Sequence, residues 1–85
     1  MLIIADENIP YVKEGFAEFG DVVTVHGRKI TKDIIKNADI LLVRSITKVN
    51  ADLIDGTSIR FVGTATIGYD HIDLAYLNSK GITFS

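Results

Sequence analysis

The stretch Ile40-Leu41-Leu42-Val43 decides the fold, because Asp39 and Arg44 enclose four consecutive β-prone apolar residues. A short apolar run between polar residues is typical of a strand that is buried on both faces of a sheet. Burial on both faces occurs mainly in parallel sheets that carry helices on each side. This stretch therefore predicts a buried strand in an α/β domain.

Four more short apolar runs lie on either side of that stretch, and segments with helical spacing separate them. The expected strands cover residues 2–5, 22–25, 59–62 and 82–84, and the expected helices begin near Pro10, Thr31, Asn50 and Asp73. No Asn-Gly pair or similar hairpin signal joins two runs, so we expect crossover connections and parallel strands. The sequence thus predicts a flavodoxin-like α/β fold, in which a doubly wound parallel sheet of about five strands has helices on both faces.

The composition limits the chain to one domain and excludes several classes of function. A chain of 85 residues buries only roughly 60–65% of its unfolded surface, which is enough for a single core. Nine basic and eleven acidic residues give a net charge of −2, and no stripe of Lys or Arg favours nucleic acid as a partner. The apolar runs are too short to span a membrane, and the start of the chain lacks the basic residues of a signal peptide. We therefore expect a cytoplasmic protein without a nucleic-acid or membrane partner.

The cysteines and histidines give no sign of a metal site. The chain has no cysteine, which excludes disulfides and thiolate ligands. His26 and His71 are not at metal-ligand spacing and have too few carboxylates nearby. We expect His26 at the end of a strand and His71 in the first turn of a helix.

Ligands of doubly wound sheets bind outside the carboxyl ends of the strands, so the loops after the strands are candidate sites. These loops cover residues 6–9, 44–48 and 63–69. Arg44 and Ser45 directly follow a buried strand, and a guanidinium fork beside a hydroxyl is suited to a carboxylate or phosphate. Lys48 supplies a further positive charge in the same loop. The alternative is that Arg44 pairs with a neighbouring acid, Asp6 or Glu7.

The loop after the fourth expected strand combines two glycines with two threonines. These residues are Gly63, Thr64, Thr66 and Gly68. Glycine lets the backbone approach a ligand closely, and threonine adds a hydroxyl donor. With Asp70 as the N-cap of the next helix, free N–H groups would gather here, so that Thr66 and the amides of Ile67 and Gly68 bind a small, hydroxylated anion. A plain strand-to-helix connection also needs glycine and a cap, so that alternative stays open.

Sequence motifs for nucleotide binding and for catalysis are absent. No G-x-G-x-x-G follows a strand, and the segment Gly63–Gly68 continues with Tyr69-Asp70 where a P-loop requires Lys and Ser or Thr. Asp6 and Glu7 resemble the acidic pair of a receiver domain, but Arg44 stands where that chemistry needs an aspartate. No nucleophile elbow or acid-base histidine with an orienting carboxylate is present. We therefore expect these residues to bind a ligand without converting it.

Two segments resemble the D-isomer-specific 2-hydroxyacid dehydrogenases, and the resemblance extends over essentially the whole chain. They are Leu42-Val43-Arg44-Ser45-Ile46-Thr47-Lys48-Val49 and Phe61-Val62-Gly63-Thr64-Ala65-Thr66-Ile67-Gly68-Tyr69-Asp70-His71-Ile72-Asp73. The resemblance implies the first part of the substrate-binding domain of a longer, homodimeric, NAD-dependent oxidoreductase, whose NAD-binding domain follows residue 85. The opening Ala5-Asp6-Glu7-Asn8-Ile9-Pro10 and the segment Gly63–Thr66 resemble a branch that acts on a phosphorylated 2-hydroxy acid. Phosphoglycerate dehydrogenases typically carry a more glycine-rich version of that loop.

The family resemblance also implies roles for particular residues. Substrate contacts fall on Ser45, Thr66 and the backbone of Ile67 and Gly68. Arg44 and Lys48 are added to this set on electrostatic grounds. The catalytic arginine, glutamate and histidine of the family lie beyond Ser85, so we assign no catalytic residue and expect the 85 residues alone to be inactive. A stand-alone, non-catalytic anion-binding or regulatory module of flavodoxin-like fold is the alternative from another class.

Overall fold

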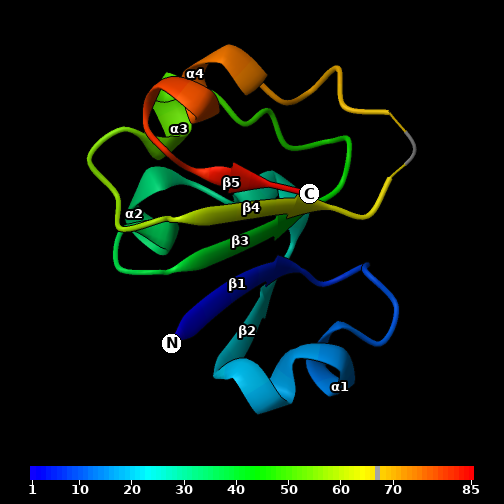
Figure 1. Cartoon of the computed structure of the whole chain (residues 1–85). Helices are drawn as coiled ribbons and strands as arrows, with labels where there is room; N and C mark the ends of the chain where they lie inside the picture. Colours follow the sequence, from blue (N-terminus) through cyan, green and yellow to red (C-terminus); the bar gives the residue numbers. More distant parts are fainter. Residues whose placement is uncertain (67) are drawn as a thin grey trace.

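A five-stranded sheet in the order β2-β1-β3-β4-β5 forms the centre of the computed structural model, which describes residues 1–66 and 68–85 (Figure 1). The strands are β1 Leu2–Asp6, β2 Asp21–Val25, β3 Ile40–Val43, β4 Phe61–Thr64 and β5 Thr83–Phe84. Every neighbouring pair is parallel. This is the strand order of flavodoxin-like, doubly wound sheets, so the predicted fold class is confirmed.

Short helices form the connections between the strands. They are α1 Val12–Phe16, α2 Lys32–Ile35, α3 Ala51–Ile54 and α4 Leu74–Ser79, with the 3-10 turns η1 Ala17–Phe19 and η2 Gly27–Lys29. Within residues 1–66 and 68–85, no helix has the length and apolar character needed to cross a membrane.

The side chains of β3 alternate between two cores on opposite faces of the sheet, as expected for a strand of period two. Leu41 and Val43 belong to the larger core, and Leu42 belongs to the smaller one, where Val12 of α1 packs. The helices on the larger core contribute Ile35, Ile54 and Leu77. Helices therefore cover both faces, and the continuous apolar pattern of β3 follows from burial on both sides.

The smaller core is only partly covered, because α1 is five residues long. A cleft of about 250 Å³ remains on this face. Its lining is mostly apolar and includes Phe16 of α1, Leu42 of β3 and Phe61 of β4. The cleft extends to Thr64 and Ala65, and it thus reaches the carboxyl edge of the sheet.

Some element boundaries differ from the sequence prediction. β4 begins two residues later than expected, because its register with β3 pairs Ile40 with Phe61. Ile34, which the helical spacing places on the apolar side of α2, is 40% exposed. The cap of α3 is as predicted, since Asn50 Oδ1 accepts a hydrogen bond from Leu53 N at 3.2 Å.

Candidate functional site

The loop after β4 starts from a fixed point, because two neighbouring strands hold its first residues. The backbone N–H of Thr64 donates to Ser85 O at 3.2 Å, directly after β5. The N–H of Ala65 donates to Val43 O at 3.0 Å, at the end of β3. The sheet itself therefore places the side chains that follow.

Three polar side chains of this loop form a hydrogen-bonded row. Thr64 Oγ1 lies 3.0 Å from Thr66 Oγ1 and 2.9 Å from His71 Nε2. The backbone N–H of Thr66 also points at Thr64 Oγ1, at 3.5 Å. All three residues are half-buried. Thr66, a predicted substrate contact, is thus held at the carboxyl edge of the sheet by its neighbours.

His71 is the residue of this row that the sequence did not single out. The sequence placed it in the first turn of a helix, whereas α4 begins three residues later, at Leu74. Its side chain instead returns to the end of β4. The available signal was a histidine seven positions after a strand-end threonine in a loop rich in hydroxyls.

The loop that follows β3 is anchored through a threonine. Thr47 is buried, and its Oγ1 donates to Gly27 O at 3.1 Å, while its N–H donates to Arg44 O at 3.1 Å. Arg44 is half-buried, and Ser45 and Lys48 are exposed. This arrangement leaves the three polar side chains at the surface of a loop whose backbone is fixed.

The alternative pairing of Arg44 with Asp6 or Glu7 is absent from the described residues. Among residues 1–66 and 68–85, neither Arg44 nor Lys48 forms an ion pair. Asp6 is fully buried, and its Oδ1 accepts a hydrogen bond from Asn8 N at 2.8 Å in the turn after β1. Its Oδ2 faces Gly27, which leaves no room for a side chain there. Arg44 is thus available to a ligand.

The two candidate loops leave the same edge of the sheet and run beside each other (Figure 1). Val49 N donates to His71 O at 2.8 Å, and Val49 forms an isolated parallel bridge with Ile72. The structure therefore brings the Arg44–Lys48 loop next to the row of Thr66 and His71. The cleft on the α1 face is lined by Thr64 but by neither Arg44 nor Ser45. The two predicted loops therefore do not line one common cleft.

The predicted helix N-terminus beside Gly68 is wrong. The N-cap of α4 is Asp73, whose Oδ1 accepts from Tyr76 N at 3.0 Å, and Asp70 lies in the preceding turn. The pairing of Val49 with Ile72 is the cause, because the N–H of Asp73 donates to Val49 O at 2.8 Å and the helix begins only after this pairing ends. The anion site thus loses the helix N-terminus that the sequence analysis gave it.

The predicted site also includes the backbone of residues 67 and 68. Gly68 has a φ of 83° and is exposed, with open space where a Cβ would lie. A positive φ explains the need for glycine there. Ile67, which the sequence analysis assigned to the same contact, lies outside the described residues.

The described residues offer no site that fits a dinucleotide or a metal ion. The turn after β1 carries Asp6 and Glu7 and no glycine, so a pyrophosphate would meet acidic side chains instead of free amides. No group of three potential metal-ligating side chains occurs in residues 1–66 and 68–85. The groups present at the carboxyl edge are hydroxyls, one imidazole and basic side chains, which are suited to an anion.

The sequence and the fold of this chain agree with those of a known class of oxidoreductase domain. The family model of the D-isomer specific 2-hydroxyacid dehydrogenases, catalytic domain, matches residues 1–85. The chain belongs to this family.

Curated relatives that match the whole chain carry the same name. The erythronate-4-phosphate dehydrogenases of Pectobacterium carotovorum and Marinobacter nauticus are 53% and 55% identical over 85 residues, and that of Marinomonas sp. is 56% identical. Each alignment covers 100% of this chain but 22% of the relative. The chain thus spans under a quarter of the length of these enzymes.

Solved structures agree in fold. The cofactor (NAD+) bound 3-phosphoglycerate dehydrogenase of Entamoeba histolytica has a TM-score of 0.79 and 25% identity, covering 99% of this chain and 32% of its own. A D-lactate dehydrogenase from Aquifex aeolicus, complexed with NAD and lactic acid, has a TM-score of 0.76 and 23% identity, covering 100% and 27%. At 23% identity, the second likeness supports the fold alone.

Proposed function

We propose that these 85 residues form part of the substrate-binding domain of an NAD-dependent dehydrogenase that oxidises the 2-hydroxyl of 4-phospho-D-erythronate, in the biosynthesis of pyridoxal phosphate. The observation that carries this proposal is the identity of 53–56% with erythronate-4-phosphate dehydrogenases over the whole chain. The geometry supports it, because an anionic, hydroxylated acid suits the hydroxyls and basic side chains of the carboxyl edge.

In this proposal, two loops hold the anionic groups of the substrate. Arg44 supplies a bidentate donor, with the Ser45 hydroxyl beside it and Lys48 as an added charge. Thr66 donates from its hydroxyl, and the backbone at residues 67 and 68 receives the carboxylate. Two observations support this proposal. Arg44 is half-buried and has no ion-pair partner among residues 1–66 and 68–85, and Thr66 has a fixed position after β4, the strand that neighbours β3.

The chemical step belongs to other parts of a longer chain. We propose that an NAD-binding domain and the catalytic residues follow residue 85, and that the full enzyme is a cytoplasmic homodimer. NAD accepts the hydride of the 2-hydroxyl carbon in such an enzyme. The acidic turn after β1 supports this division, since it is unsuited to the dinucleotide. The 85 residues alone are therefore expected to bind substrate without activity.

Two alternative functions can be distinguished from this proposal. A phosphoglycerate dehydrogenase has the same fold, as the Entamoeba histolytica enzyme shows, but at 25% identity it is far more distant than the 53% relatives. A non-catalytic anion-binding module would have no dehydrogenase activity in its full-length form.

The decisive experiment is NADH formation by the full-length protein. We expect clear preference for 4-phospho-D-erythronate over 3-phospho-D-glycerate at equal concentration. Preference for 3-phospho-D-glycerate would keep the anion site but overturn the substrate assignment. No turnover of either compound would favour another 2-hydroxy acid or the non-catalytic module.

A further inference from the structure

The row at the end of β4 connects a histidine to the hydroxyl that the proposed function uses. His71 Nε2 lies 2.9 Å from Thr64 Oγ1, which in turn lies 3.0 Å from Thr66 Oγ1. The position of His71 is fixed by the backbone, because its carbonyl oxygen accepts from Val49 N at 2.8 Å. The distances make Thr64 a link between the imidazole and Thr66.

A row of two hydroxyls and an imidazole nitrogen has a direction, because each hydroxyl carries a single proton. In one direction the Nε2–H of His71 donates to Thr64, Thr64 donates to Thr66, and the Thr66 proton is free to point outward. In the other direction Thr66 donates to Thr64, and Thr64 donates to an unprotonated Nε2. Thr66 then presents only lone pairs to a ligand.

Only the first direction suits an anionic substrate. A carboxylate or phosphate oxygen is an acceptor, so it needs the outward proton of Thr66 and is repelled by its lone pairs. The imidazole decides between the two directions, since a proton on Nε2 makes His71 a donor to Thr64.

We propose that His71 is a positioning residue for the substrate: its Nε2–H directs the Thr66 hydroxyl outward through Thr64. This inference rests on the proposed function, in which Thr66 donates to the anionic substrate. His71 acts without touching the substrate, and it takes no part in the hydride transfer.

Substitutions in the full-length enzyme test this arrangement. Thr66→Val removes the outward donor, and losing one hydrogen bond to an anionic group should raise the KM for substrate by about tenfold or more, with kcat nearly unchanged. His71→Leu removes the donor at the other end and should raise the KM by about two- to fivefold. His71→Gln keeps an N–H of similar reach and should restore most of the affinity.

The double variant separates positioning from packing. If His71 acts only through Thr66, His71→Leu has no further effect on KM once Thr66→Val is present. A further loss of the same size in the double variant, or no rescue by His71→Gln, would overturn the role of His71. An unchanged KM in Thr66→Val would instead overturn the substrate contact in the proposed function, so the two failures are distinguishable.

A direct measurement keeps the inference testable if His71→Leu does not fold. Nitrogen NMR of the full-length enzyme with labelled histidine, assigned by the signal that His71→Gln removes, reports the protonated nitrogen of His71. With substrate bound we expect a proton on Nε2. A neutral ring protonated only on Nδ1 would show that the row runs in the opposite direction and would overturn the inference.

Discussion

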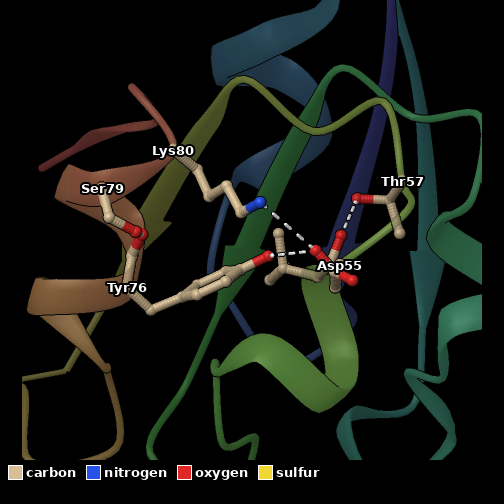
Figure 2. Close-up of polar contacts among 6 residues, drawn as sticks. Asp55, Thr57, Tyr76, Ser79 and Lys80 are labelled. Atoms are coloured by element: carbon tan, nitrogen blue, oxygen red, sulfur yellow. Dashed lines mark hydrogen bonds and ion pairs between the residues drawn. The ribbon is translucent and has the colours of Figure 1, made fainter.

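The two edges of the sheet use charged residues in opposite ways. At the amino edge, Asp39 Oδ1 lies 3.8 Å from an Arg60 guanidinium nitrogen, while Asp39 Oδ2 accepts a hydrogen bond from Leu2 N. At the same edge, Asp55 lies between α3 and α4 and receives the Tyr76 hydroxyl and the Lys80 ammonium group (Figure 2). Both ion pairs of the described residues lie at this edge.

In the part of the chain that the structure describes, the carboxyl edge has no such ion pair. Arg44 and Lys48 have no ion-pair partner among the described residues, and the one buried carboxylate nearby, Asp6, is enclosed by the turn after β1. The hydroxyls of Thr64 and Thr66 bond to each other and to His71. Charged side chains pair with one another at the amino edge, whereas basic and hydroxyl groups left open at the carboxyl edge are suited to bind an anion.

The largest expected effect comes from comparing two arginines, Arg44 at the carboxyl edge and Arg60 at the amino edge. In the full-length enzyme, Arg44→Gln keeps length and polarity but removes the charge, and it should weaken substrate binding by about 1.5–3 kcal/mol, roughly 10- to 150-fold. Arg60→Gln is the matched control at the amino edge, where the side chain is 74% exposed, and it should leave affinity unchanged. Substrate titration by calorimetry measures both.

Equal losses in the two variants would show that the arginines act only through the overall charge of the protein. That outcome would remove the distinction between the edges. A loss with Arg44→Gln that disappears at high salt would likewise indicate long-range attraction rather than a bidentate contact.

The next effect concerns the support beneath the carboxyl edge. In Gly27→Ala, the new Cβ would overlap the buried Asp6 Oδ2 and lie 2.6 Å from Ile46 Cδ1. Asp6 cannot move away easily, because its other oxygen holds Asn8 N. We expect the free energy of unfolding to fall by about 1–3 kcal/mol, as measured by urea unfolding of the chain.

A second glycine provides the control for this experiment. Gly15 lies in α1 and has open space around its Cβ position, so Gly15→Ala should raise the free energy of unfolding by about 0.5–1 kcal/mol. If Gly27→Ala were as well tolerated as Gly15→Ala, the Arg44–Lys48 loop would not depend on close packing of Gly27 against Asp6.

The sequence predicted the strands well because their signal is local. Continuous apolar runs such as Ile40–Val43 indicate strands buried on both faces, and the absence of hairpin turns indicates a parallel order. The carboxyl edge followed from topology alone, so the loops holding Arg44, Ser45 and Thr66 could be named before their contacts were known.

Long-range pairing explains what the sequence could not predict. Asp70 and Asp73 are both suitable caps, and the choice between them depends on the bridge between Val49 and Ile72, which are far apart in sequence. The same bridge keeps His71 out of the helix and directs it towards Thr64. The sequence therefore predicted a helix N-terminus where the structure has a row of hydrogen-bonded side chains.

The smallest expected effect lies at the amino edge. Tyr76 donates from its hydroxyl to Asp55 Oδ1 at 3.2 Å. Partial burial, this hydrogen bond and the negative charge of Asp55, in that order, raise the pKa of Tyr76 above its ordinary value of 10.0. Since folding raises the pKa, the bond stabilises the fold while the hydroxyl is protonated, and this contribution is lost as pH rises through the folded-state pKa.

Tyrosinate absorbance against pH, compared between the natural chain and Tyr76→Phe, isolates this one titration from those of the other two tyrosines. We expect its midpoint above 10.0, and we expect Asp55→Asn to bring the midpoint down by removing the neighbouring charge. Tyr76→Phe should also reduce the loss of stability in alkali. A midpoint at or below 10.0 would mean that Lys80, whose ammonium group lies 3.7 Å from the same Asp55 oxygen, offsets the effect of that carboxylate on Tyr76.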